Sequence, residues 1–230
     1  MKTTFYKFLV ISIVTLIFNA AAYGQGNTNV GIAVTAKLMG GTEHKIPGGE
    51  YKSDLKRGMQ LNDRDWVRTK SDGYLALMFI DDKSLLKLRE NSELKITAVR
   101  TSTGLDKSIQ MSFGKVKAEI SPQRSGEFTI TTPTSVASVK GTIFWIISTP
   151  EGDIIVGIEG TVTVTNTESG ETVTVGVGQT ATSSSDGTIG VAPTAPGGVP
   201  TDPGATDEGN ELRIKLENAE GDSKEIIIEY

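Results

Sequence analysis

The chain has 230 residues, no cysteine and a single histidine, His44. The lack of cysteine excludes disulfide scaffolds, cysteine-ligated zinc or iron–sulfur sites and cysteine nucleophiles. A Ser-His-Asp triad would depend on His44, which lies in a glycine-rich stretch. With 37% hydrophobic and 22% charged residues, the composition is that of a soluble globular chain long enough to bury a core.

Residues 1–24 have the pattern of a secretory signal peptide. Lys2 and Lys7 form a positive n-region, residues 8–18 are apolar, and residues 22–24 form a small-x-small cleavage site. The apolar run is short compared with the roughly 20 residues of a membrane-spanning helix, although an uncleaved anchor is the alternative. We expect cleavage after Gly24, a periplasmic or secreted protein, and no transmembrane helix in the mature chain.

The charge of the chain is unevenly distributed. Residues 37–140 contain 18 Lys and Arg against 13 Asp and Glu, whereas residues 141–230 contain 3 against 15. The basic residues of the first half are interleaved with acids and accompany no recognition motif, so we expect no nucleic-acid partner.

Residues 25–182 show the alternation of apolar and polar residues that is typical of β-strands. Residues 161–165 and 172–175 alternate threonine with valine on both sides of a Ser-Gly bend, which predicts a hairpin. No stretch after the leader has a helical apolar stripe. The sequence predicts an all-β domain of many short strands, either a compact sandwich-like roll or a short β-solenoid, and leaves these two open.

Two further segments are predicted after this domain. Residues 183–210 are rich in Ser, Gly and Pro and are expected to form a flexible linker. Residues 211–230 contain two apolar or alternating runs around a turn and predict a β-hairpin. Since an isolated hairpin is marginally stable in water, we expect it to dock on the main domain or to add to the sheet of a partner.

Patterns that resemble catalytic motifs lack their required context. Ser53-x-x-Lys56 matches a penicillin-interacting motif but lies in a loop-forming stretch, and residues 176–181 match a dinucleotide fingerprint but cannot open a helix. Asp81-Asp82 does not lie in a calcium-binding loop and is typical of a turn. We therefore predict no catalytic, cofactor-binding or metal-binding residue, no cofactor and no enzymatic activity.

One segment is sharply patterned. Residues 132–144 have the form Thr-Pro-x5-Val-(Arg/Lys)-Gly-Thr-x-Phe. Other segments agree with it in order, and the match extends over about residues 31–183, so the chain resembles the FecR domain family. The residues that carry the resemblance are Thr132, Pro133, Val139, Lys140, Gly141, Thr142, Phe144, Asp65, Val67, Arg68, Thr69, Glu159 and Gly160, with Gly178-Gln179 at the end.

These motif residues are expected to build the fold and to offer interaction sites. Gly141 inside a β-type run predicts a bulge or a close approach of two backbones. Val139, Ile143 and Trp145 are expected to share one face of this strand, with Phe144 and Ile146 on the other, so that the strand is covered on both sides.

The resemblance implies a role in the cell envelope. The regulator for which the family is named relays a signal from an outer-membrane receptor to a sigma factor, using a cytoplasmic segment and a transmembrane helix before its periplasmic domain. Because this chain has only a leader before its domain, we do not expect direct control of a sigma factor. We expect an exported, non-enzymatic protein-interaction or sensing module whose partner is an envelope protein or the cell-surface matrix. The alternative is a structural or assembly component whose C-terminal hairpin adds to a partner sheet.

Overall fold

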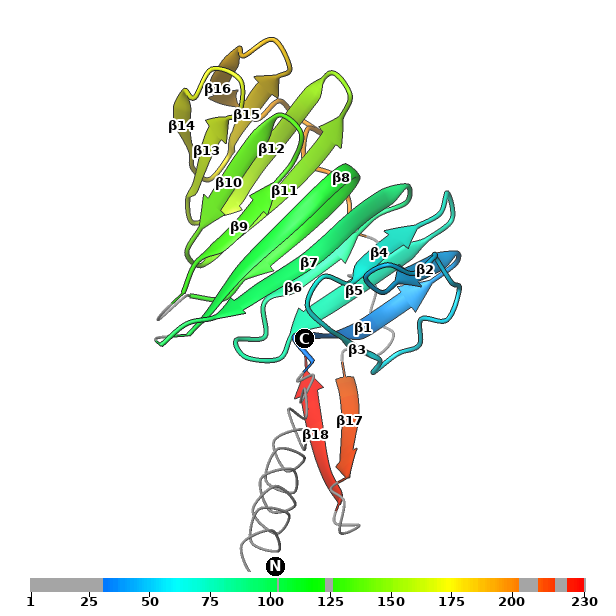
Figure 1. The fold of residues 1–230 in the computed structure, drawn as a ribbon. Helices are drawn as coiled ribbons and strands as arrows, with labels where there is room; N and C mark the ends of the chain where they lie inside the picture. The colour runs from blue at the N-terminus through cyan, green and yellow to red at the C-terminus, as the bar shows by residue number, and fades with distance from the viewer. Residues whose placement is uncertain (1–30, 103, 123–125, 203–210, 218–222, 230) are drawn as a thin grey trace, which may run out of the picture. The chain divides into compact units, whose positions relative to one another are not determined.

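The computed structural model describes residues 31–102, 104–122, 126–202, 211–217 and 223–229, so the expected leader lies outside the described residues. The described residues form strands joined by turns and loops, and the predicted all-β class is confirmed (Figure 1). Among these residues no helix is long and apolar enough to cross a membrane.

Sixteen strands form one hydrogen-bonded network, which divides into two sheets that share strand β8 (Leu105–Ile120). Residues up to Phe113 pair with β7 in sheet B, whereas Gly114 to Ile120 pair with β11 in sheet A. One strand of 16 residues therefore holds the two layers together (Figure 1).

Sheet A contains, in hydrogen-bonded order, β3 (Gln60–Leu61), β1 (Ala33–Met39), β5 (Tyr74–Phe79), β6 (Leu85–Leu88), β8, β11 (Thr142–Thr149), β12 (Gly152–Glu159), β15 (Gln179–Ser184) and β16 (Ile189–Pro193). Sheet B contains β2 (Thr42–Lys45), β4 (Trp66–Thr69), β7 (Ser92–Arg100), β8, β9 (Phe128–Thr131), β10 (Ser135–Val139), β13 (Val162–Asn166) and β14 (Thr172–Val175). The hairpin expected around the Ser-Gly bend is confirmed as β13 and β14.

The core lies between the two sheets. Its largest cluster draws buried aliphatic and aromatic side chains from both layers, for example Leu94 and Ile130 of sheet B with Leu86 and Phe144 of sheet A. Each fully buried side chain of this kind contributes about 1.5–3 kcal/mol to stability. This common interior and the almost entirely antiparallel pairing identify the sandwich-like roll rather than the solenoid.

The boundary expected at residue 183 differs from the structure. Strand β15 ends at Ser184, and β16 pairs with it, so both belong to sheet A. These residues are polar because they form strands at the edge of the sheet, where only alternate side chains are buried. Ala181 and Ser183 face the core, whereas Thr182 is exposed.

Residues 194–202, called the strap below, return across the outer face of sheet A (Figure 1). Thr194 N–H donates to Gly178 O at 2.8 Å, and at the other end Asp202 Oδ2 lies 3.1 Å from both Lys87 Nζ and Lys117 Nζ. Between these two ends, the residues that pair across the strands of sheet A include Val156 of β12 and Trp145 of β11. The strap therefore explains why the outward-facing Trp145 is only 1% exposed.

The C-terminal hairpin is present as β17 (Glu211–Glu217) and β18 (Ser223–Glu229), paired antiparallel to each other in a separate two-stranded sheet. Its register places Ile214 opposite Ile226. Residues 203–210 of the expected linker lie outside the described residues.

The strap predicts a fluorescence change on loss of its anchor. In a Trp66→Phe background, where Trp145 is the only tryptophan, Asp202→Asn should increase acrylamide quenching of Trp145 and lower the free energy of unfolding by about 1–3 kcal/mol, because charged hydrogen bonds to Lys87 and Lys117 are lost. Glu171→Gln, at an exposed acid outside the strap, is the control and should change neither quantity. Equal quenching in both variants would contradict the strap.

The same anchor has a predictable pH dependence. Burial acts to raise the pKa of Asp202, but hydrogen bonds from Lys117 and Lys87 outweigh it and hold the pKa below its ordinary value of 3.8. A carboxyl group with a lowered pKa in the folded state stabilises the fold above its ordinary pKa and loses this contribution as the pH falls. The stability difference between the parent and Asp202→Asn should therefore be full at neutral pH and vanish well below pH 3.8.

Candidate functional site

Three of the motif segments lie where the chain passes from one sheet to the other. Residues 140–141 connect β10 of sheet B to β11 of sheet A, and residues 160–161 connect β12 of sheet A to β13 of sheet B. The register pairs Val139 with Val162, so both crossings lie at the same end of the roll. Residues 176–178, before β15, make a third crossing at this end.

The first two crossings pack directly against each other. A Cβ atom on Gly160 would lie 2.7 Å from Gly141 O, and Gly160 has a φ angle of +73°. Thr142 Oγ1 donates a hydrogen bond of 3.0 Å to Thr161 O, which ties the two turns together. The expected close approach of backbones at Gly141 is therefore present.

The faces expected for the residues after Gly141 are partly wrong. Val139 and Phe144 both point into the core, whereas Trp145 lies under the strap on the outer face of sheet A. The alternation does not continue from Val139 because β10 ends there and the chain changes sheets before β11 begins at Thr142. A bulge is also present, but it lies between Ile143 and Phe144 in the pairing with β12.

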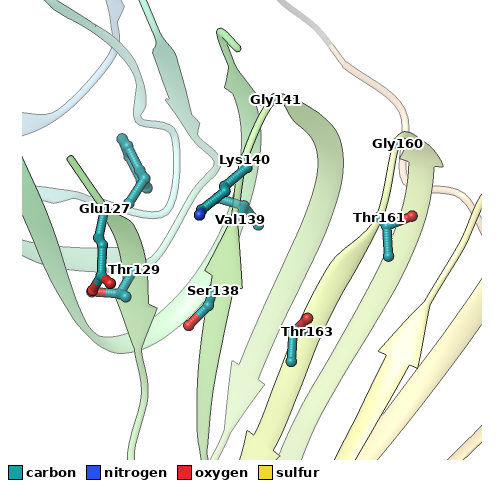
Figure 2. Close-up of a pocket in the computed structure, with 10 residues that line it drawn as sticks. Glu127, Thr129, Ser138, Val139, Lys140, Gly141, Gly160, Thr161 and Thr163 are labelled. Carbon is teal, nitrogen blue, oxygen red and sulfur yellow. The ribbon is translucent and has the colours of Figure 1, made fainter. Parts of the chain in front are cut away.

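The crossings border a surface hollow of about 540 Å³, called the groove below. Its walls are the ends of β9, β10 and β13 on the outer face of sheet B, and Figure 2 shows the Lys140 ammonium turned toward Thr129 of β9 and Glu127 just before it. The lining residues are Glu127, Phe128, Thr129, Ser138, Val139, Lys140, Gly141, Gly160, Thr161 and Thr163. Four motif residues thus contribute to one concave surface.

The polar groups of the groove are free to bind. Lys140 and Glu127 are exposed, and neither forms an ion pair within the described residues. The hydroxyls of Ser138 and Thr163 likewise have no hydrogen-bond partner in the described part of the chain. The groove therefore offers one ammonium, one carboxylate and several hydroxyls, a set suited to hydrogen-bonded recognition.

The Thr-Pro part of the motif lies at the opposite end of β10 and has a structural role. Thr132 Oγ1 and Thr134 Oγ1 both donate to the buried Asp153 Oδ2, the latter at 2.5 Å. Ser135 N–H donates to Thr132 Oγ1 at 2.9 Å, which closes the turn around Pro133. These bonds hold the β9–β10 turn of sheet B against β12 of sheet A.

The motif residues Asp65, Val67, Arg68 and Thr69 lie on or next to β4 and do not approach the groove in the sheet order, whereas Glu159 is the exposed last residue of β12 and pairs with Ile143. Val67 is buried in the core, and Thr69 Oγ1 donates to Arg89 O. Arg68 Nε lies 2.6 Å from Glu43 Oε2, and its guanidinium stacks 3.8 Å from the centre of a tyrosine ring. Hydrogen bonds from Lys70 and Arg68 lower the pKa of Glu43, which fits a carboxylate held ionised between two cations.

Asp65 is buried beside the only histidine of the chain. His44 Nε2 lies 3.2 Å from Asp65 Oδ2, and His44 Nδ1 lies 3.6 Å from Asp54 Oδ1. Asp65 Oδ2 also accepts a hydrogen bond of 2.8 Å from Asn62 N–H. Within the described ranges, no group of three or more His, Asp or Glu side chains is arranged to hold a metal ion.

Sequence reasoning identified Lys140, Gly141 and Gly160 but missed the hydroxyl side of the groove. Glu127, Thr129, Ser138, Thr161 and Thr163 come together only through the pairing of β9, β10 and β13. The alternating threonines of residues 161–165 were the available signal.

The model of the family described as FecR protein matches residues 65–180, half of the chain. The chain belongs to the FecR family. FecR proteins are envelope-associated regulatory proteins, so membership supports a signalling or sensing module. In this FecR protein the match covers the three crossings and the groove.

Solved structures that match part of the chain include two crystal structures, at 2.50 Å and 1.65 Å resolution, of a candidate anti-sigma factor from Parabacteroides distasonis ATCC 8503. Each is 14% identical to this FecR protein with a TM-score of 0.49, over 56% of this chain and 59% of that chain. This chain thus aligns with little more than half the length of those proteins. No curated protein matches the sequence.

The packing of the crossings predicts unequal effects of two matched substitutions. Gly160 and Gly178 have similar φ angles of +73° and +68°, but a Cβ on Gly178 would meet nothing within 4 Å. Gly160→Ala should therefore lower stability by about 1–3 kcal/mol more than Gly178→Ala, because only the former forces two backbones apart. Chemical denaturation of both variants measures the difference, and equal losses would contradict the stacked crossings.

Proposed function

We propose that this FecR protein is an exported, non-enzymatic sensing module of the bacterial cell envelope that binds its partner through the groove. The observation that carries the proposal is the position of Lys140: the family motif places it on a crossing turn, yet its ammonium has no ion-pair partner among the described residues. The fold needs the glycines of the crossings, whereas nothing in the packing needs this exposed cation.

The chemistry of the groove supports binding rather than catalysis. Its polar side-chain groups are hydroxyls with one ammonium and one carboxylate, and the only histidine of the chain, His44, belongs to β2 at the far edge of sheet B. A hollow that is open to the surface suits a partner that binds and dissociates reversibly, as a sensing module requires.

The alternative is that the C-terminal hairpin forms the contact by adding to a partner sheet. Strands β17 and β18 pair with each other, and within the described residues neither pairs with another strand. Each strand therefore has one edge with backbone groups available to a partner strand.

Export predicts a defined N-terminus. If residues 1–24 are removed as a signal peptide, the protein recovered from the periplasm or the medium should begin at Gln25. N-terminal sequencing or intact-mass measurement after expression in a Gram-negative host checks this. Recovery of the intact N-terminus from the membrane fraction would instead indicate the uncleaved anchor.

Binding through the groove predicts sensitivity to the charge of Lys140. Lys140→Glu in the full chain should reduce recovery of the partner from envelope extract by roughly tenfold, since a charge-assisted contact of about 1.5 kcal/mol becomes repulsive. Lys56→Glu makes the same change at an exposed lysine outside the groove and should leave recovery unchanged.

The hairpin alternative is separated by a third variant. Ile214→Pro removes a backbone N–H from β17 and disfavours its pairing. If the groove binds the partner, this variant should recover as much partner as the parent. Loss of recovery with Ile214→Pro but not with Lys140→Glu would favour strand addition by the hairpin.

A further inference from the structure

We propose that the outer face of sheet B binds a neutral polysaccharide chain of the cell-surface matrix along a row of hydroxyl side chains that passes through the groove. This inference deepens the proposed function, because it rests on the groove being the binding surface and names the chemical class of its partner.

The row follows from the strand registers. Six neighbouring strands place a serine or threonine at the same level, and the register joins each to the next across the sheet. The row is Thr97, Ser108, Thr129, Ser138, Thr163 and Thr174. Three of these residues also line the groove, so the row and the groove form one surface (Figure 2).

The hydroxyls of this row point away from the core and are available. The residues next to them in sequence, such as Phe128, Ile130, Val162 and Val164, are buried between the sheets. Within the described residues only Thr129 makes a side-chain hydrogen bond, a long one of 3.5 Å to Lys107 O. The row therefore presents a line of groups that can each donate one hydrogen bond and accept others.

The spacing of the row suits a chain of sugars. Neighbouring strands lie about 4.8 Å apart, so six strands present hydroxyls over about 24 Å. A pyranose ring in a 1,4-linked chain advances the polymer by a similar distance, which allows one sugar unit to face each strand. The right-handed twist of a sheet turns successive strands by roughly 20°, and a single flexible chain can follow this twist whereas a flat crystalline surface cannot.

The charge of the surface favours a neutral chain. The row and the groove together contain one lysine and one glutamate among their charged residues. In the groove, the ammonium of Lys140 is balanced by the carboxylate of Glu127. Both can bond to sugar hydroxyls, while the row and the groove together offer no excess of positive charge to attract an acidic polymer.

The composition of the surface is unlike that of a protein interface. Specific protein interfaces have a core of large apolar and aromatic anchors. None of the exposed large hydrophobic residues of the described chain lies in the row, and the one aromatic residue of the groove, Phe128, is buried. Hydroxyl groups repeated along a line match a polymer that itself repeats hydroxyl groups.

The test is native electrophoresis of the full mature chain in gels that contain a soluble polysaccharide. The probes are hydroxyethylcellulose, arabinoxylan and dextran as neutral chains and polygalacturonate as an acidic chain. At least one neutral polymer should retard the protein. Thr163→Val keeps the shape of the side chain but removes its hydroxyl, and it should weaken this retardation about fivefold, as expected for one net hydrogen bond.

Thr182→Val is the matched control. Thr182 is an exposed threonine of β15 in sheet A, it pairs with Ile154, and it has no hydrogen-bond partner of its side chain within the described residues. Its substitution should leave the retardation unchanged. The double variant Ser138→Ala/Thr163→Val should weaken binding further than Thr163→Val alone, and thermal melting of all variants verifies that they fold.

Three results would overturn the inference. Retardation by none of the neutral polymers would do so, as would retardation by polygalacturonate alone, which would indicate attraction to Lys140. Equal effects of Thr163→Val and Thr182→Val would place the binding elsewhere. If Lys140→Glu lowers recovery of an envelope protein as expected while no polysaccharide binds, the inference fails and the proposed function stands.

Discussion

The repeated crossing of the chain between two sheets is the constraint on which the rest of the structure depends. Strand β8 belongs to both layers, and each later hairpin must pass from one layer to the other. Because the crossings stack with Gly160 against the carbonyl of Gly141, no side chain fits between them. The FecR motif is therefore first a folding requirement, and Lys140 and Glu159 are its exposed charged residues without an ion-pair partner in the described part of the chain.

At the borders of the apolar core, buried polar and charged side chains form hydrogen bonds and ion pairs with each other. Asp153 receives the hydroxyls of Thr132 and Thr134 at the end opposite the crossings. The buried Lys107 lies 2.8 Å from Asp81 Oδ2, also contacts Asp82, and packs near the rings of Phe79 and Phe128. A buried ammonium is costly unless it is paired, so the Asp81-Asp82 turn is fixed by this lysine. The turn assigned to these acids from the sequence thus has a specific partner 25 residues further along the chain.

The features that the sequence predicts are those encoded locally. Alternation identifies the strands, and the threonine-rich repeat identifies the β13–β14 hairpin, because both depend on neighbouring residues. The sheet change after Val139 breaks the alternation without a local signal other than Gly141. The strap depends on Asp202 meeting Lys117, a contact over 85 residues, and the hydroxyl row depends on a parallel pair between β8 and β9. Such contacts are set by the packing of the whole domain, which composition and periodicity do not report.

The two outer faces of the roll differ in what they leave open. Sheet A is covered by the strap over Trp145, and its other end holds a second buried cluster that includes Tyr74 and Met78. Sheet B leaves its hydroxyl row exposed. Strand propensity alone would explain the threonines of this row, since β-branched residues favour strands, but it does not explain Ser108 and Ser138. The hydroxyl group is what these six positions share, and the proposed binding of a neutral polysaccharide rests on it.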